Sequence, residues 1–128
     1  MKCFIKTSET FLADAKRLGK KYKSLLSDLD EFQKELKKNP FIGADLGKGL
    51  RKIRMAIAPK GKGKSGGARI ITYNIIQVED KVYVILLTMY DKSEQESISD
   101  KELLKLLEKN GLKSEVVGAG GTACTYYF

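Results

Sequence analysis

The sequence predicts an α+β domain in which two N-terminal helices and a C-terminal helix pack on a largely antiparallel sheet, in the order β-α-α-β-β-β-α. Three observations predict this fold. Apolar residues recur at helical spacing before Pro40, they alternate with polar residues from Leu50, and helical spacing returns after Ile98. A chain of 128 residues is long enough for one hydrophobic core. We therefore expect a single domain over residues 1–113 and a tail over 114–128 whose structure the sequence does not predict.

The N-terminal part of the chain predicts a short strand and two helices. Residues 3–6 fit a strand, and Ser8 is the expected N-cap of a first helix. A second helix is expected from about Lys20 to Lys38, because Asn39-Pro40 is a helix stop. Both apolar stripes are expected in the core: Phe11, Leu12, Ala15 and Leu18 in the first helix, and Tyr22, Leu25, Leu26, Leu29, Phe32 and Leu36 in the second.

The first strand of the C-terminal part carries basic side chains in alternation with apolar ones. Ile53 and Met55 alternate with Lys52 and Arg54. Because successive side chains of a strand point to opposite faces, Lys52 and Arg54 should project from the same face of the sheet.

Two more strands and a helix are expected after this one. Residues 68–76 and 82–90 fit strands, and the second of these is apolar on both faces, which predicts an interior position in the sheet. A last helix is expected over residues 98–112, with Ser99 as its N-cap and Gly111 at its end.

Positive charge is concentrated in one segment of the chain. The net charge is +8, and eight basic residues with no acidic residue among them lie between positions 48 and 69. They are Lys48, Arg51, Lys52, Arg54, Lys60, Lys62, Lys64 and Arg69. The rest of the chain holds as many bases as acids. This segregation predicts a polyanionic partner, and a solvated basic loop without a ligand is the alternative.

Composition also narrows the chemistry and the location. The chain has no histidine, so the commonest general base and metal ligand is missing. No signal peptide or membrane span is visible, and a cytoplasmic protein with no membrane partner is expected. Cys3 and Cys124 lack metal-ligand spacing, and two thiols are favoured over a disulfide.

The stretch PKGKGKSGGAR, residues 59–69, contains the GKS ending of a nucleotide-binding P-loop. Position 58 is Ala where that motif needs its first glycine, and the β-branched residues after Arg69 predict a strand where the motif needs a helix. We therefore exclude a nucleotide-binding P-loop. Alternating glycine and lysine still suits phosphate, since the backbone can approach closely and the lysines supply charge.

Several segments together resemble the RelE/ParE toxin superfamily, and most closely its HigB-like branch. They are LRKIR from Leu50, KGKSGGARIITY, the strand VYVILL and the segment YDKSEQESIS from Tyr90, and the resemblance covers about residues 8 to 110. It implies the toxin of a bacterial type II toxin–antitoxin pair that cuts mRNA on the ribosome without metal or cofactor. The implied partners are the ribosome, mRNA and a cognate antitoxin, which is expected to be small and to contain a helix-turn-helix.

The resemblance also implies roles for individual residues. Arg69 and Arg54 match arginines that stabilise the phosphate, and Lys92 stands where related toxins carry a basic residue. Tyr90 and Glu94 are candidates for proton transfer or base stacking. The residues expected to bind RNA phosphates are Arg51, Lys52, Lys60, Lys62 and Lys64. Near Ile98 the family's base-stacking tyrosine has no counterpart.

Two other functions remain open from the sequence. A ParE-like inhibitor of DNA gyrase shares the fold and needs no proton-transfer residues. An inactive basic RNA-binding module is the third hypothesis. Arg54 and Arg69 could also form ion pairs with Asp91 or Glu94, in which case they would have a structural role.

Overall fold

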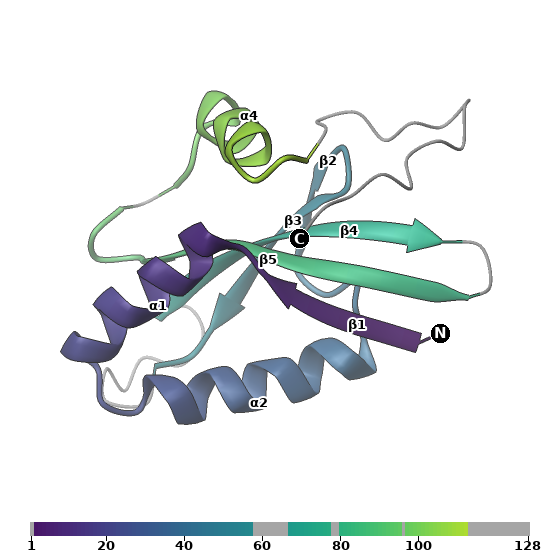
Figure 1. Ribbon diagram of the computed structural model, residues 1–128. Coiled ribbons are helices and arrows are strands. Elements are labelled where there is room, and N and C mark those ends of the chain that lie inside the picture. The colour runs from purple at the N-terminus through teal and green to yellow at the C-terminus, as the bar shows by residue number, and fades with distance from the viewer. Residues whose placement is uncertain (1, 58–66, 78–79, 96, 113–128) are drawn as a thin grey trace.

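The computed structural model describes residues 2–57, 67–77, 80–95 and 97–112 (Figure 1). Within these ranges, five strands and three helices follow one another in the order β-α-α-β-β-β-β-α. They are β1 (Lys2–Thr7), α1 (Glu9–Lys21), α2 (Leu25–Lys38), β2 (Ala44–Gly47), β3 (Leu50–Met55), β4 (Ala68–Gln77), β5 (Lys81–Asp91) and α4 (Asp100–Lys109). The predicted α+β class is therefore confirmed. None of the described helices is long and apolar enough to span a membrane.

The five strands form one sheet in the order β1-β5-β4-β3-β2. The pairs β2–β3, β3–β4 and β4–β5 are antiparallel, whereas β1 pairs with β5 in parallel. β5 has a partner on each side, which confirms its predicted interior position. The sequence analysis missed β2, because its four residues, ADLG, show no apolar alternation. Gly43, which precedes β2, and Gly47, its last residue, adopt positive φ.

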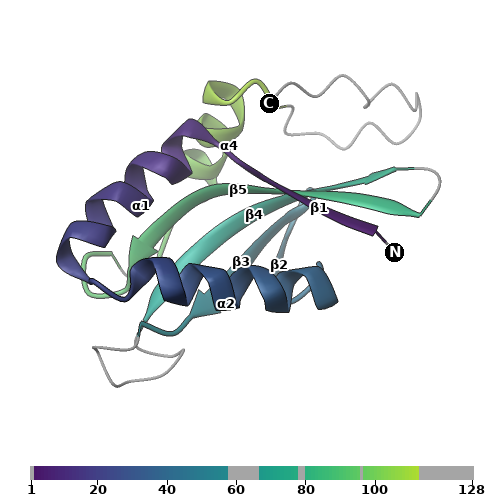
Figure 2. The same ribbon diagram turned by 60° about the horizontal axis from the view of Figure 1, so that its bottom comes forward.

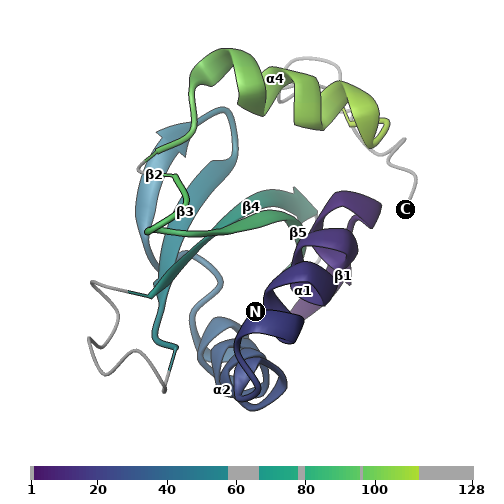
Figure 3. The same ribbon diagram turned by 90° about the vertical axis from the view of Figure 1, so that its left-hand side faces the viewer.

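Helices cover both faces of the sheet (Figure 3). α1 and α2 lie on one face, side by side along the sheet, and α4 is the one helix of the described ranges on the other (Figures 2 and 3). Two separate hydrophobic clusters match this division. One joins the apolar residues of α1 and α2 to the sheet, and the other joins Leu103 and Leu107 of α4 to the opposite face. The sheet is thus the middle layer of three.

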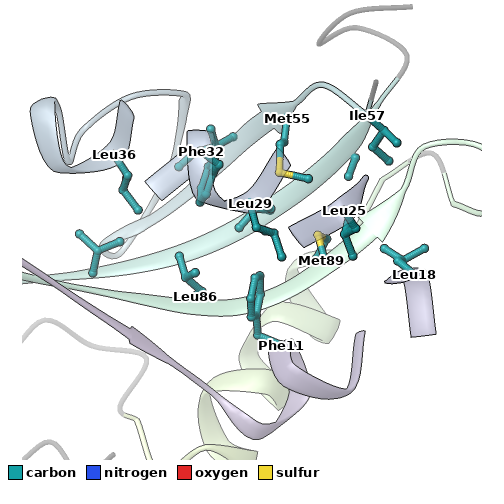
Figure 4. Packing of buried hydrophobic residues seen from close by; sticks show 14 of the residues in the cluster. Phe11, Leu18, Leu25, Leu29, Phe32, Leu36, Met55, Ile57, Leu86 and Met89 are labelled. Atoms are coloured by element: carbon teal, nitrogen blue, oxygen red, sulfur yellow. The ribbon is translucent and has the colours of Figure 1, made fainter. Parts of the chain in front are cut away.

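The larger cluster contains most of the predicted helix stripes (Figure 4). Phe11, Leu25 and Phe32 are at most 3% exposed. Two predictions were wrong: Leu12 is 55% exposed and Leu26 is 82% exposed. Each follows a buried residue by one position in its helix, which turns its side chain by about 100° away from the sheet.

The predicted helix starts are confirmed at Ser8 and Ser99, and other predicted boundaries were wrong. The Ser8 hydroxyl accepts a hydrogen bond from the Phe11 amide, and the Ser99 hydroxyl accepts one from Glu102. α1 continues to Lys21 and α2 begins only at Leu25, so the second helix does not start at Lys20. α4 is shorter than the predicted 98–112 because its first turn begins after the Ser99 cap.

Candidate functional site

Two arginines and a tyrosine lie in a row across three strands. In the strand register, Arg54 of β3 is opposite Arg69 of β4, and Arg69 is opposite Tyr90 of β5. Residues directly opposite in an antiparallel pair share a face of the sheet. Tyr90 packs in the cluster on the α4 side, so the row lies on the face on which α4 packs. The predicted common face of Lys52 and Arg54 follows from the same register, since Lys52 is opposite Ile71 of that cluster.

The row places two positively charged side chains on opposite residues of neighbouring strands, an arrangement that suits an anion. Arg69 is only 4% exposed, and burial, followed by the charge of Arg54, lowers its pKa from the usual value. A guanidinium stays charged even so. Like charges directly opposite each other in a sheet are unfavourable, and a protein keeps such a pair where function needs it. A phosphate would be bound by both guanidinium groups.

Lys92 lies at the end of the sheet near this row. Its amide donates a hydrogen bond to the Gly67 carbonyl at 3.2 Å, two residues before Arg69, and its side chain is exposed. The strands therefore bring Arg54, Arg69, Lys52 and Lys92 to one region, although 40 residues separate the first and last of them in the chain.

Arg51 has a different environment from the other candidate RNA-binding residues. Its Nε donates to the Ile42 carbonyl at 3.0 Å and its Nη2 donates to Gly43 at 2.8 Å. It alternates with Lys52 along β3 and so points to the other face. Arg51 therefore binds the backbone just before β2, and its side chain is not part of the row of Arg54, Arg69 and Tyr90.

Glu94 is likewise bound elsewhere. Its Oε2 accepts a hydrogen bond from Arg17 Nη1 of α1 at 2.6 Å, and this hydrogen bond lowers the pKa of Glu94 below its ordinary value. α1 covers the opposite face of the sheet from Arg69. The described contacts therefore connect Glu94 with the α1 layer.

Asp91 strengthens the same connection between α1 and the end of β5. It is fully buried, its Oδ2 accepts a hydrogen bond from the Tyr22 hydroxyl, and Lys21 lies 3.7 Å away. Its Oδ1 accepts from the Ser93 amide at 3.0 Å. Asp91 stands between Tyr90 and Lys92 and fixes the backbone that carries both. The sequence analysis missed this anchor, since the segments involved are about 70 residues apart.

Tyr90 borders a groove between β5 and α4. Tyr90 is 4% exposed, and its hydroxyl has no hydrogen-bond partner among the described residues. Burial raises its pKa most; Arg69 lowers it and Glu102 raises it. Tyr90 is thus neutral at pH 7 and acts as a hydroxyl donor. The sequence analysis did not select Glu102, which joins the groove only through packing of α4 on the sheet.

Three candidate lysines cannot be placed. Lys60, Lys62 and Lys64 lie in residues 58–66, outside the described part of the chain. Within the described ranges, no group of three His, Cys, Asp or Glu side chains is arranged to hold a metal ion. Cys3 is a free thiol, and Cys124 lies outside the described residues.

Fold and site together define a class: a small basic α+β domain whose mostly antiparallel sheet presents paired arginines beside its C-terminal helix. A family model described as the RelE toxin of the RelE/RelB toxin–antitoxin system matches residues 9–115. The match covers most of the chain, and the chain therefore belongs to the RelE toxin family. Membership makes it a toxin of a toxin–antitoxin system, for which a cognate antitoxin is implied.

Proposed function

We propose that this toxin is an endoribonuclease that cuts mRNA on the ribosome, as HigB-like members of the superfamily do. The observation that carries the proposal is the pairing of Arg69, which is buried, with Arg54 directly opposite on the next strand. Two arginines on directly opposite strand positions suit a phosphodiester, because each guanidinium can bind phosphate oxygens. Membership in the RelE toxin family supports the same chemistry.

In the proposed reaction the ribose 2′-oxygen attacks the adjacent phosphorus. The bond from phosphorus to the 5′-oxygen breaks, which leaves a 2′,3′-cyclic phosphate and a 5′-hydroxyl. Arg69 and Arg54 stabilise the extra negative charge of the phosphorane. Lys92 protonates the leaving 5′-oxygen. In this proposal Lys60, Lys62 and Lys64 steer the RNA and are the candidates to accept the 2′ proton.

The ribosome supplies what the described side chains lack. Glu94 is held by Arg17, and Tyr90 is a neutral donor, so neither is suited to take the 2′ proton. Orientation of the substrate alone accounts for a large part of a rate enhancement. We therefore propose that the ribosome orients the mRNA and that the toxin supplies the cations. Such a protein acts in the cytoplasm.

The antitoxin is proposed to act on the same surface. A small partner, with a helix-turn-helix for its own operator, would neutralise the toxin by covering Arg54 and Arg69 or by shifting α4. The cationic row leaves room for a complementary acidic segment.

Arg69→Ala tests the function directly. Induced in bacteria, the wild type is expected to arrest growth and to produce cleavage of translated mRNA, mapped by primer extension. The variant should cut at least about 100-fold more slowly, as expected for loss of one group that stabilises developing charge. Its circular dichroism and melting temperature should match those of the wild type.

Two controls separate the outcomes. Lys34→Ala removes one positive charge from an exposed site on α2 and should leave cleavage unchanged. Purified mRNA without ribosomes should stay intact. Arrest with intact mRNA would disprove the nuclease, and trapped gyrase cleavage complexes would then identify the ParE-like activity. Full toxicity of Arg69→Ala would show that Arg69 does not stabilise the transition state.

A further inference from the structure

The backbone of Lys92 is held against the neighbouring strand. Its amide donates to the Gly67 carbonyl at 3.2 Å, and Gly67 lies two residues before Arg69. A Cβ at Gly67 would lie 2.0 Å from the Met55 carbonyl oxygen, so this backbone packs too closely for any residue but glycine. The contact therefore sets where Lys92 stands relative to Arg69.

Asp91 organises the turn that contains Lys92. Its Oδ1 accepts a hydrogen bond from the Ser93 amide at 3.0 Å. Its backbone carbonyl accepts from the Glu94 and Gln95 amides at 2.9 and 3.2 Å, and its own amide donates to Glu94 Oε1 at 3.3 Å. These hydrogen bonds span Lys92, so the position of the Lys92 backbone follows that of Asp91.

Tyr22 connects this turn to α1. It is the C-cap of α1, its amide donates to the Leu18 carbonyl at 2.8 Å, and its carbonyl accepts from the Leu25 amide at 3.1 Å. Both helices thus hold its backbone. The Tyr22 hydroxyl donates to Asp91 Oδ2, and the carboxylate is fully buried, where loss of a donor is costly. Lys21 lies 3.7 Å from the same oxygen, but its side chain is 55% exposed and its charge is screened by solvent.

We propose that Tyr22 is a positioning residue for cleavage: through its hydrogen bond to Asp91 it fixes Lys92 beside the phosphate that Arg69 binds. The inference rests on the proposed function, in which Lys92 gives its proton to the leaving 5′-oxygen. The lysine side chain is long and flexible, so its ammonium is well placed only if its backbone is held. A displacement of about 1 Å can cost about 100-fold in rate.

A double-mutant cycle tests whether Tyr22 acts through Lys92. Single-turnover cleavage of mRNA on programmed ribosomes is measured over a range of concentrations of the full-length toxin. Tyr22→Phe removes only the hydroxyl and should lower the maximal rate about tenfold, with the half-saturating toxin concentration unchanged. In the Lys92→Ala background the same substitution should lower the rate by less than about twofold, because the group that Tyr22 positions is absent.

Tyr83→Phe is the matched control for the loss of a hydroxyl. Tyr83 lies near the start of β5, whereas Lys92 follows its end, and its ring stacks on Phe4 of β1. The variant should cut mRNA at the wild-type rate. A general loss of structure in Tyr22→Phe would lower the rate by the same factor with and without Lys92.

Amide hydrogen exchange tests the position of Lys92 apart from catalysis. It is followed by NMR on the full-length toxin without ribosomes. Tyr22→Phe should speed exchange of the Lys92 and Ser93 amides about tenfold, through more frequent local opening of the turn. Exchange of the Ile71 amide in β4 should not change.

The outcomes separate the inference from the proposed function. Unchanged exchange at Lys92 and Ser93, cleavage by Tyr22→Phe at the wild-type rate, or an equal loss of rate with and without Lys92 would overturn the role of Tyr22, even if the wild type cuts mRNA. Faster exchange at Lys92 together with mRNA that the wild type leaves intact would support Tyr22 as the residue that positions Lys92 and disprove the nuclease.

Discussion

The two faces of the sheet are built from the same strands and yet differ in what they bury. Toward α1 and α2, the strands present Ile53, Ala68 and Met89, all at most 3% exposed. On the other face, the next residues along the same strands are Arg54, Arg69 and Tyr90. Among the described elements, α1 and α2 pack on the first face and α4 packs on the second (Figure 3).

The difference shows how a small domain divides stability from function. Because side chains alternate along a strand, one face can provide a continuous apolar core while the other holds charges that would destabilise that core. The anchor of Asp91 to α1 connects the two faces, since it fixes the stretch of β5 between Tyr90 and Lys92. Three sets of substitutions test this division.

The largest effect on folding is expected on the face of α1 and α2. Leu25 is 1% exposed, whereas the next residue, Leu26, is 82% exposed. Leu25→Ala should lower the free energy of unfolding by about 2–5 kcal/mol, through lost burial and the cavity it leaves. Leu26→Ala should change it by less than about 0.5 kcal/mol. Urea denaturation measures both, and equal effects would show that the apolar face is not closed as described.

Substitutions of the two arginines of β3 are expected to have different effects. Arg54→Ala is expected to weaken RNA binding about tenfold, to lower the salt dependence of binding, and to leave stability nearly unchanged. Arg51→Ala should keep RNA binding and lower stability by about 0.5–1.5 kcal/mol, since the Ile42 and Gly43 carbonyls lose a donor that water only partly replaces. Fluorescence anisotropy across a salt series and thermal melts separate the two. Weaker RNA binding by both variants to the same extent would contradict the assignment of Arg51 to the turn.

The smallest effect is expected at the ion pair that joins α1 to the turn after β5. Both partners are partly exposed, so Arg17→Gln should cost less than about 1 kcal/mol. Folding lowers the pKa of Glu94 below 4.5, so its contribution is fully present above that pH and is lost as the pH falls through the lowered value. The stability difference between wild type and Arg17→Gln should therefore be present at pH 7 and shrink below about pH 4.5.

A comparison of melts at pH 7 and pH 3 measures this. The control is Lys34→Gln, which removes a cation from an exposed pair within α2. A difference between wild type and Arg17→Gln that stays constant over this pH range would show that Glu94 is not its source.

Local signals in the sequence were sufficient for most of the fold. Apolar periodicity and the Ser8 and Ser99 caps located the helices, and the alternation after Leu50 placed Lys52 and Arg54 on one face. The same signals failed for β2, which is short and ends in a glycine, and for Leu12 and Leu26, which continue an apolar run past the edge of the buried stripe. Periodicity shows that a stripe exists more reliably than it shows its width.

The sequence by itself determined the fold class and the segregation of positive charge, because these depend on residue type and short-range spacing, whereas Arg54 and Arg69 were selected through the resemblance to the RelE/ParE superfamily. Only the tertiary structure decided which charges meet. Strand register placed Arg69 between Arg54 and Tyr90. Glu94 binds Arg17 of α1, and Asp91 binds Tyr22 at the end of α1. Packing of α4 brought Glu102 toward Tyr90. These contacts join residues far apart in the chain, and their partners follow from packing of whole elements, which no local pattern specifies.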